Sequence, residues 1–404
     1  EVWINEGLSE LSSYLNGYSE SAYLEAFSRQ PDVQLNDFHY EGEEADAHYG
    51  ASFLFFAYFL EQFGEQATRS LVSRPDNGIM SVEQVLLDLN PGTSFNDFIA
   101  QWLVANYLDS SLADEGVYFY RDLDLPEMDD AADFRRFPES GQATIQQYGA
   151  DYLRIRSEKP VSFVFTGTQQ VRLVDTQPRS GQFIWSSYPA DDSDMTLTKE
   201  LDLSEVDQAA FNFWTWYELE EGWDYAYVVV STDDGATWIP LETGSSTTSN
   251  PQGNSYGPAY TGVSGGGEKP IWIEETADLS PFTGQKIQLR FETITDDTVH
   301  GQGFVIDDIS IPEVGFYDDF EQEDGDWNSE GFIRHSNELP QHFIIQAIMI
   351  QDGAYEIRPL DLDSKQRGQW LFSFDEDFDE VVVIVAGSTP VTNQPAGYQF
   401  RVTE

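Results

Sequence analysis

The sequence predicts a multidomain α + β protein, with a helical region first and β-sandwich modules after it. Apolar residues recur at helical spacing through about residue 112. From residue 142 onward, short strand-like segments alternate with Gly and Pro turns, as in all-β domains. With 404 residues, 40% of them hydrophobic, the chain can build about two to four domains, each with its own core.

Residues 1–112 are expected to be helical. The recurring apolar residues are Leu8, Leu11 and Leu15, then Phe53, Phe56 and Leu60, and finally Val85, Leu86 and Leu89. Breaks occur at Gly17, Pro31, Gly64 and Pro91-Gly92. A last helix is predicted from Phe95 to Leu108, with Trp102 on its core face. Residues 113–139 follow as an acidic connector.

The β-rich remainder falls into three segments, 140–185, 186–313 and 314–404. The first contains only four strand-like runs, which are too few to close a sandwich comfortably. We therefore expect 140–185 and 314–404 to form one sandwich, with 186–313 inserted between its halves. Two separate small domains are the alternative.

The charge balance excludes several classes of partner. The formal net charge is -52, from 72 acidic and 20 basic residues. Nucleic acid and anionic membranes would be repelled by such a chain. The longest apolar run, Phe53–Leu60, is too short to cross a bilayer. The acidity fits calcium loading, a salty environment or plain solubility, and the lack of cysteine means that the protein has no disulfides.

A carboxylate pair stands at the start of the chain, in the segment Trp3-Ile4-Asn5-Glu6-Gly7-Leu8-Ser9-Glu10. Glu6 and Glu10 fall on one face of a helix, because positions i and i+4 are neighbours there. A carboxylate fixed on a rigid helix suits the third ligand of a catalytic zinc. A solvated helix start with scattered acids is the alternative.

This segment resembles the W-x-N-E-G-x-[AS]-[DE] motif of gluzincin metallopeptidases. The resemblance implies that residues 1–112 are the C-terminal helical half of a zincin catalytic domain. It also implies that Glu6 binds zinc, while Asn5 and Glu10 orient the ligands from the second shell of the site. The five His, at 39, 48, 300, 335 and 342, contain no H-E-x-x-H. We therefore expect the missing N-terminal catalytic half to supply that helix, and this fragment to be inactive alone.

A second candidate for catalysis is His48-Tyr49, ahead of the apolar stretch 53–63. Gluzincins place a His or Tyr at the head of a downstream helix, where it stabilises the oxyanion. The resemblance assigns this role to His48, with Tyr49 as the second choice, and Gly64 matches the Gly that ends the corresponding helix. The acids Glu43, Glu44 and Asp46 are expected to hold His48 protonated. A helix-entry His packed against aromatic rings is the alternative.

The segment 186–313 contains Trp223-Asp224-Tyr225 and closes on Asp307-Asp308-Ile309. On these residues it resembles the MAM-like jelly-roll module of immune inhibitor A-type secreted metalloproteases. Those enzymes use a different zinc motif, so the two halves of the chain resemble different families. Such modules often bind calcium where the first and last strands meet, which would use Asp191, Asp192, Asp194, Asp307 and Asp308. Exposed turn acids are the alternative.

Two further patterns have structural interpretations. Ser231–Trp238 matches the Asp-box S-x-D-x-G-x-T-W, which predicts a hairpin turn. Trp214 and Trp216 share one side of a strand. A buried core face is the preferred interpretation of that pair, and a sugar-binding face is the other.

The sequence thus predicts part of a secreted, extracellular zinc metalloendopeptidase that hydrolyses peptide bonds with a zinc-activated water. Zinc in the intact enzyme and calcium in the jelly roll are the expected cofactors. The expected partners are protein or peptide substrates, with glycan or cell wall as further partners of the β modules. The alternative function is a non-enzymatic extracellular protein that binds glycans or mediates adhesion.

Overall fold

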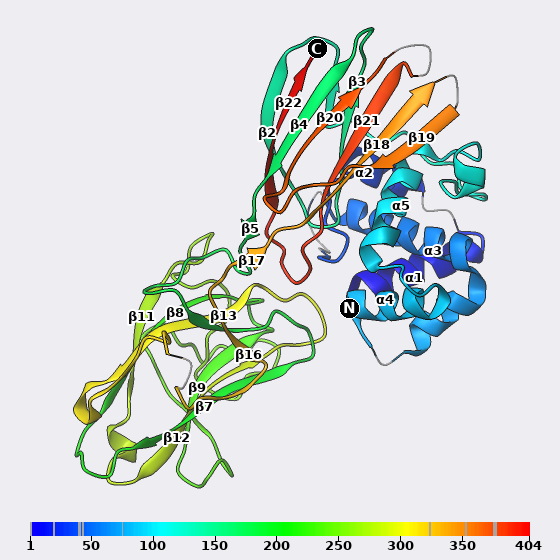
Figure 1. Cartoon of the computed structure of the whole chain (residues 1–404). Coiled ribbons are helices and arrows are strands. Elements are labelled where there is room, and N and C mark those ends of the chain that lie inside the picture. Colours follow the sequence, from blue (N-terminus) through cyan, green and yellow to red (C-terminus); the bar gives the residue numbers. More distant parts are fainter. Residues whose placement is uncertain are drawn as a thin grey trace. The chain divides into compact units, whose positions relative to one another are not determined.

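A computed structural model describes residues 2–18, 21–38, 42, 44–74, 76–322, 325–351, 354–374 and 378–404 (Figure 1). The chain forms two compact units. The first unit comprises residues 1–173 and 339–404, and the inserted unit comprises residues 174–338. These boundaries correct the expected ones at 185/186 and 313/314. Residues 184–187, 316–318, 328–330 and 332–335 pair with strands of the inserted unit, so they belong to it.

Five helices precede the strands: α1 (Val2–Leu15), α2 (Ser21–Arg29), α3 (Ala45–Ser73), α4 (Gly78–Leu89) and α5 (Phe95–Leu108). Helix α3 is central, because every residue from 51 to 59 is buried. The expected break at Gly64 is confirmed. Gly64 adopts φ 76° and ψ 176°, which are not helical, so α3 consists of two helical segments that meet at a kink there. Buried Ala67 and Leu71 continue the apolar face beyond the kink.

The first unit contains a two-sheet sandwich built from both of its chain segments. One sheet has the order β1 (Ala132–Phe134), β3 (Asp151–Ile155), β21 (Glu380–Gly387), β18 (Phe343–Gln351), β19 (Ala354–Pro359). The other has the order β2 (Glu139–Ile145), β22 (Ala396–Thr403), β4 (Val161–Gly167), β20 (Arg367–Phe372). The short strands β5 (Gln170–Val171) and β17 (Leu339–Pro340) pair with each other.

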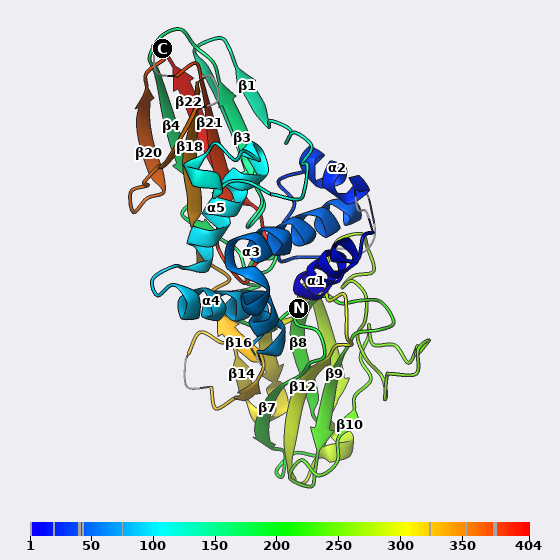
Figure 2. The same ribbon diagram turned by 90° about the vertical axis from the view of Figure 1, so that its right-hand side faces the viewer.

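The helices cover the outer face of the first of these sheets, and Figure 2 shows α5 beside β18. The Tyr152 hydroxyl donates a hydrogen bond to the Leu103 carbonyl at 2.9 Å, and the Gln346 amide donates to the Ala100 carbonyl at 2.9 Å. Strand β21 is buried on both faces, which explains its continuous apolar run. Helices and sandwich therefore share one body.

The expected connector 113–139 packs on this body. It contains the 3-10 helix η1 (Asp114–Gly116) and strand β1. Tyr120 is fully buried there, and its hydroxyl donates to Asn106 Oδ1 at 2.6 Å. None of the helices in the described part of the chain is long and apolar enough to cross a membrane.

The inserted unit is a second β-sandwich. One sheet has the order β10 (Ile239–Pro240), β9 (Tyr225–Ser231), β12 (Lys286–Ile294), β7 (Asp194–Asp202), β15 (Asn328–Glu330). The facing sheet has the order β11 (Ile273–Asp278), β8 (Ala210–Glu218), β13 (Gly303–Ile311), β6 (Ile184–Ser187), β16 (Phe332–His335), and β14 (Phe316–Asp318) pairs with β13. Two 3-10 helices, η2 (Ser280–Phe282) and η3 (Pro312–Val314), lie in the connections.

The Asp-box residues form the turn between β9 and β10. Thr237 donates to Asp233 through its amide at 2.9 Å and its hydroxyl at 2.7 Å. Asp234 and Gly235 have φ of 56° and 84°, as a tight turn requires. The Arg290 guanidinium covers the Trp238 ring at 3.9 Å from its centroid. The turn is thus held together by its own side chains.

The expected buried face of Trp214 and Trp216 is confirmed for Trp216, which is buried, whereas Trp214 is half-buried. The alternate residues of β8, Phe211, Phe213 and Tyr217, enter the core between the sheets. Trp214 and Trp216 therefore lie on the other face of that sheet. Trp216 is buried there, and the Arg179 guanidinium covers Trp214 at 4.1 Å from its ring centroid. This face of β8 is therefore not an open aromatic surface, because Trp216 is buried and Arg179 covers Trp214.

Candidate functional site

The candidate site lies in the first unit, where the motif helix α1 packs against α3. Trp3 anchors α1, with its ring centroid 5.4 Å from that of Phe55 and 5.6 Å from that of Phe56. Gly7 lets the two helices approach closely. A Cβ at this position would lie 2.6 Å from the Phe56 ring and 2.7 Å from the Ser52 carbonyl oxygen. The Trp and Gly of the motif thus fix α1 in place.

This packing brings the carboxylates of α1 near Tyr49 of α3. Burial raises the pKa of Tyr49, and the charges of Glu6, Tyr23 and Glu10 raise it further, in that order. Glu6 and Glu10 are both half-buried, whereas Asn5 is exposed. The raised pKa keeps the Tyr49 phenol protonated at neutral pH. A protonated phenol beside two carboxylates is able to donate a hydrogen bond to an oxygen that gains negative charge.

Aromatic neighbours hold Tyr49 in place. Its ring stacks on Tyr23 of α2, with centroids 5.0 Å apart, and meets Phe38 edge-on at 5.0 Å. Gly50 allows α2 to come this close, because a Cβ there would clash with the Tyr23 carbonyl oxygen. Sequence reasoning missed Tyr23 and Phe38. No spacing in the sequence connects them to Tyr49, since they meet it only through the packing of α2 and the following loop on α3.

His48 lies deeper than Tyr49. Its side chain is only 2% exposed, and its ring centroid lies 5.5 Å from that of Phe38. It sits in the first turn of α3, where its amide donates to the Glu44 carbonyl at 3.1 Å. Of the acids expected to act on it, Glu43 lies outside the described residues. The placement resembles the expected alternative, a helix-entry His packed against an aromatic ring.

The residues of this site fit one part of a zinc site. Zinc in a catalytic site takes three protein ligands and leaves one position open. Among the described residues, the single group of three or more potential ligands close enough to share an ion lies in the inserted unit, not at Glu6. Glu6 is a suitable carboxylate ligand, and Glu10 is suitably placed behind it on the same helix face. The imidazole ligands would have to come from elsewhere.

Among the described residues, no three of the five acids expected to bind calcium lie close enough together to share an ion. Asp307, fully buried in β13, accepts hydrogen bonds from the amides of Arg179 at 2.8 Å and Ser180 at 3.1 Å through Oδ2. Its Oδ1 accepts from the Asp308 amide at 2.8 Å. Asp308 in turn accepts from the hydroxyls of Ser180 at 2.7 Å and Tyr317 at 3.0 Å. Both oxygens of Asp307 are therefore used to hold the backbone.

The other three acids lie before and at the start of β7. Asp191 Oδ1 is 2.7 Å from His300 Nδ1. The amide of Asp192 donates to the Asp296 carbonyl at 2.6 Å, and Asp194 is exposed at the first position of β7. Asp307 lies partway along β13, opposite Trp214. Hydrogen bonds thus occupy both carboxylate oxygens of Asp307 and Oδ1 of Asp308.

Comparisons with known proteins identify the β-rich part of the chain. Residues 148–337 match the family model of the immune inhibitor A-like MAM domain, which confirms the resemblance seen in the sequence. The chain is 27% identical over 144 residues to the pre-pro-metalloprotease PrtV of Vibrio cholerae serotype O1, a match that covers 36% of this chain and 14% of PrtV. It is 32% identical over 149 residues to immune inhibitor A of Bacillus thuringiensis subsp. alesti, covering 36% of this chain and 20% of that protein.

Bacillopeptidase F of Bacillus subtilis is 28% identical over 101 residues, which are 25% of this chain and 6% of that protein. The chain therefore spans only a small part of each of these relatives. A solved structure, the capsid protein VP17 of bacteriophage P23-77, aligns at 9% identity with a TM-score of 0.14, too low to relate the folds.

Proposed function

We propose that this chain, of which residues 148–337 match an immune inhibitor A-like MAM domain, is part of a secreted zinc metalloendopeptidase. Its similarity to a protein named a metalloprotease supports the reaction class. The observation that carries the proposal is the grouping of Glu6, Glu10 and Tyr49 where α1 packs on α3. In this proposal the helices of residues 1–112 are the C-terminal half of a zincin catalytic domain.

Each residue of the group has a role that its chemistry suits. Glu6 would bind the zinc, and Glu10 and Asn5 would orient the other ligands. The zinc, when bound, supplies an activated water for attack on a peptide carbonyl. Tyr49 would donate its phenolic proton to the carbonyl oxygen as negative charge develops there. We assign this role to Tyr49 in preference to His48, because His48 is buried against Phe38.

A protease assay tests the proposal. The 404-residue chain and the full-length gene product are each incubated with a casein substrate, with and without added Zn²⁺. We expect hydrolysis by the full-length product, its loss with a chelator, and no hydrolysis by the chain alone. Hydrolysis by the chain alone would show that it carries a complete site. A folded full-length product with no activity on any peptide library would refute the peptidase.

A further inference from the structure

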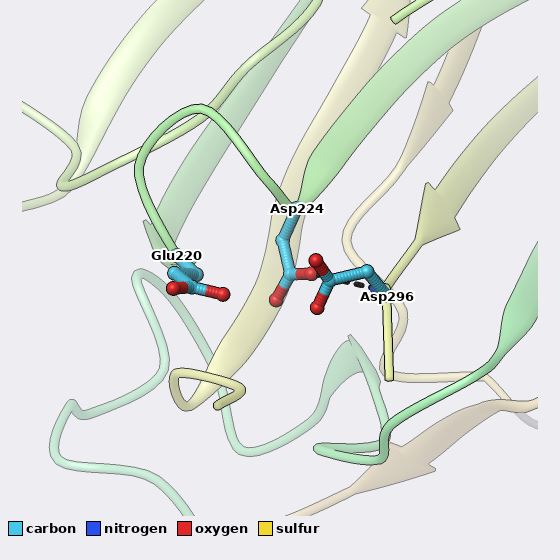
Figure 3. Close-up of side chains that lie close together, drawn as sticks. All are labelled: Glu220, Asp224 and Asp296. Atoms are coloured by element: carbon cyan, nitrogen blue, oxygen red, sulfur yellow. Dashed lines mark hydrogen bonds between the residues drawn. The ribbon is translucent and has the colours of Figure 1, made fainter. Parts of the chain in front are cut away.

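Three carboxylates that the sequence did not single out as metal ligands converge at one end of the inserted unit, near the predicted acids Asp191 and Asp192. Glu220 and Asp224 belong to the turn that joins β8 to β9, and Asp296 follows the end of β12. The ends of β9 and β12 are adjacent, because Tyr225 pairs with Ile294. One ligand oxygen from each of the three carboxylates lies within 4.8 Å of the other two. Figure 3 shows the three side chains directed toward a common space.

Backbone contacts fix this arrangement. The Asp224 amide donates to the Glu220 carbonyl at 3.0 Å, which closes the turn. Gly222 takes φ 81° within it, a value that favours glycine. The Asp296 amide donates to Asp224 Oδ1 at 3.0 Å and so ties the β12 end to the turn (Figure 3). The carboxylates are therefore held close together although their charges repel one another.

Asp224 supplies an independent sign of a ligand. Its side chain is 1% exposed, yet no group among the described residues donates a hydrogen bond of ordinary geometry to its Oδ2. A buried acceptor left in this state costs about 1–3 kcal/mol, and more when it is charged. Burial raises the pKa of Asp224 to about 7, although the Asp296 and Glu220 amides favour the charged form, and the charges of Asp296 and Glu220 raise it further. Asp307 is as deeply buried, but both of its oxygens accept hydrogen bonds.

The charged groups that act on the pKa of Glu220 and Asp296 from around the cluster are further carboxylates. Burial raises the pKa of both Glu220 and Asp296, and the charges of Asp191 and Asp297 raise both further. Asp192 also raises the pKa of Asp296, so six carboxylates lie in this neighbourhood. Within the described ranges, no Lys, Arg or His forms an ion pair with Glu220, Asp224 or Asp296. His300 lies 2.7 Å from Asp191, through its Nδ1.

We propose that Glu220, Asp224 and Asp296 bind a calcium ion. The available ligands are all oxygen atoms on irregular loops, which suits the flexible coordination of Ca²⁺. Zinc would favour nitrogen or sulfur ligands, which this cluster does not offer. The ion would neutralise the repelling carboxylates and accept the lone pair of Asp224 Oδ2. The ion would join the β8–β9 turn to the end of β12. The amide of Asp192 donates a hydrogen bond to the Asp296 carbonyl, so the loop before β7 would be connected to the same ion.

Calcium titration of the chain tests this site without reference to peptidase activity. The chain is treated with EDTA, dialysed, and titrated with CaCl₂ by isothermal calorimetry, with thermal unfolding followed in parallel. We expect one tight site and an unfolding temperature for the inserted unit that rises with calcium concentration. MgCl₂ at equal concentration should give a smaller shift, because Mg²⁺ needs near-ideal octahedral geometry.

Variants identify the ligands. Asp224→Asn keeps the shape of the side chain and should lower calcium affinity at least about tenfold, as should Glu220→Gln on the half-buried side of the cluster. Asp307→Asn is the matched control, since it removes an equally buried acid and should leave the calcium response intact. Near-UV circular dichroism confirms that each variant is folded. No tight site in the wild type, or equal responses in Asp224→Asn, Glu220→Gln and the control, would overturn the proposal and leave only diffuse binding to the acidic surface.

Discussion

The ring of Tyr49 stacks on the ring of Tyr23 with centroids 5.0 Å apart. Besides burial, the charges of Glu6 and Glu10 raise the pKa of the Tyr49 phenol. This relationship joins three helices, because Tyr23 lies on α2, Tyr49 on α3 and both acids on α1. Because the stacked neighbour already restricts the ring, the phenol loses little conformational entropy when it donates a hydrogen bond. The motif at the start of the chain is therefore linked to a specific donor.

Replacing Tyr49 tests that donor. In the full-length product, Tyr49→Phe should lower kcat about 10²-fold with little change in KM, because the lost hydrogen bond forms only as charge develops on the oxygen. Tyr23→Phe is the control, since it keeps the stacked ring and removes only a hydroxyl, and it should change kcat much less. Steady-state kinetics with a fluorogenic peptide measures both. Equal losses in the two variants would point to packing instead of hydrogen-bond donation.

Gly7 sets the distance between α1 and α3. Gly7→Ala should destabilise the first unit by about 1–3 kcal/mol, because its Cβ would press on the Phe56 ring and the Ser52 carbonyl. Urea unfolding followed by circular dichroism at 222 nm reports the helices α1 to α5, which lie in the first unit. Ser9→Ala, at an exposed position of the same helix, should change stability by less than about 0.5 kcal/mol. A Gly7→Ala variant as stable as Ser9→Ala would contradict the close packing.

Asp151 makes the stability of the sandwich depend on pH. Burial raises its pKa to about 6, although the Tyr398 hydroxyl donates to it at 2.5 Å across the two sheets. The folded state holds this proton more tightly than the unfolded state, so the contribution of Asp151 to stability is fully present below about pH 4 and declines as the pH rises toward 6. Urea midpoints between pH 4 and 7.5 should decline less steeply in Asp151→Asn than in the wild type. If the urea midpoints of the wild type and Asp151→Asn declined in parallel with pH, the raised pKa of Asp151 would be contradicted.

Local signals in the sequence predicted the positions of the helices well, but they predicted less well which core each helix packs into. The last helix, with Ser94 and Asp97 forming a capping box, runs from Phe95 to Leu108 as expected. The sequence also predicted the break at Gly64 in the helix containing His48, but not the helical segment that continues from it to Ser73. A glycine at φ 76° kinks a helix when apolar residues beyond it still have a core to enter, and that core is a tertiary feature.

Strand counting suggested that the two flanking β segments are incomplete alone, but it did not show where each segment ends. The boundary depends on which strands pair. Phe332 of β16 lies in the core of the inserted unit because β16 pairs with β6, and no periodicity reveals such long-range pairing. The expected limits at 185/186 and 313/314 were therefore misplaced.

The metal hypotheses show the same limit. Asp307 and Asp308 were predicted to bind calcium because they close the module, but amides occupy both oxygens of Asp307 and hydroxyls bond Oδ1 of Asp308. Asp224 stood in the quoted segment Trp223-Asp224-Tyr225 and was used there only as a mark of resemblance. Its partner Asp296 is distant in the sequence, and the two meet only because β9 and β12 pair.

Zinc content tests the central claim most directly. The full-length gene product is purified as wild type, Glu6→Gln and Glu10→Gln, and zinc per molecule is measured by atomic absorption after dialysis. We predict one zinc in the wild type, loss of most of it in Glu6→Gln, and retention in Glu10→Gln with affinity about 10–100-fold weaker, as for a residue that only orients a ligand. A Glu6→Gln protein that keeps its full zinc would contradict the assignment of Glu6 as the third ligand.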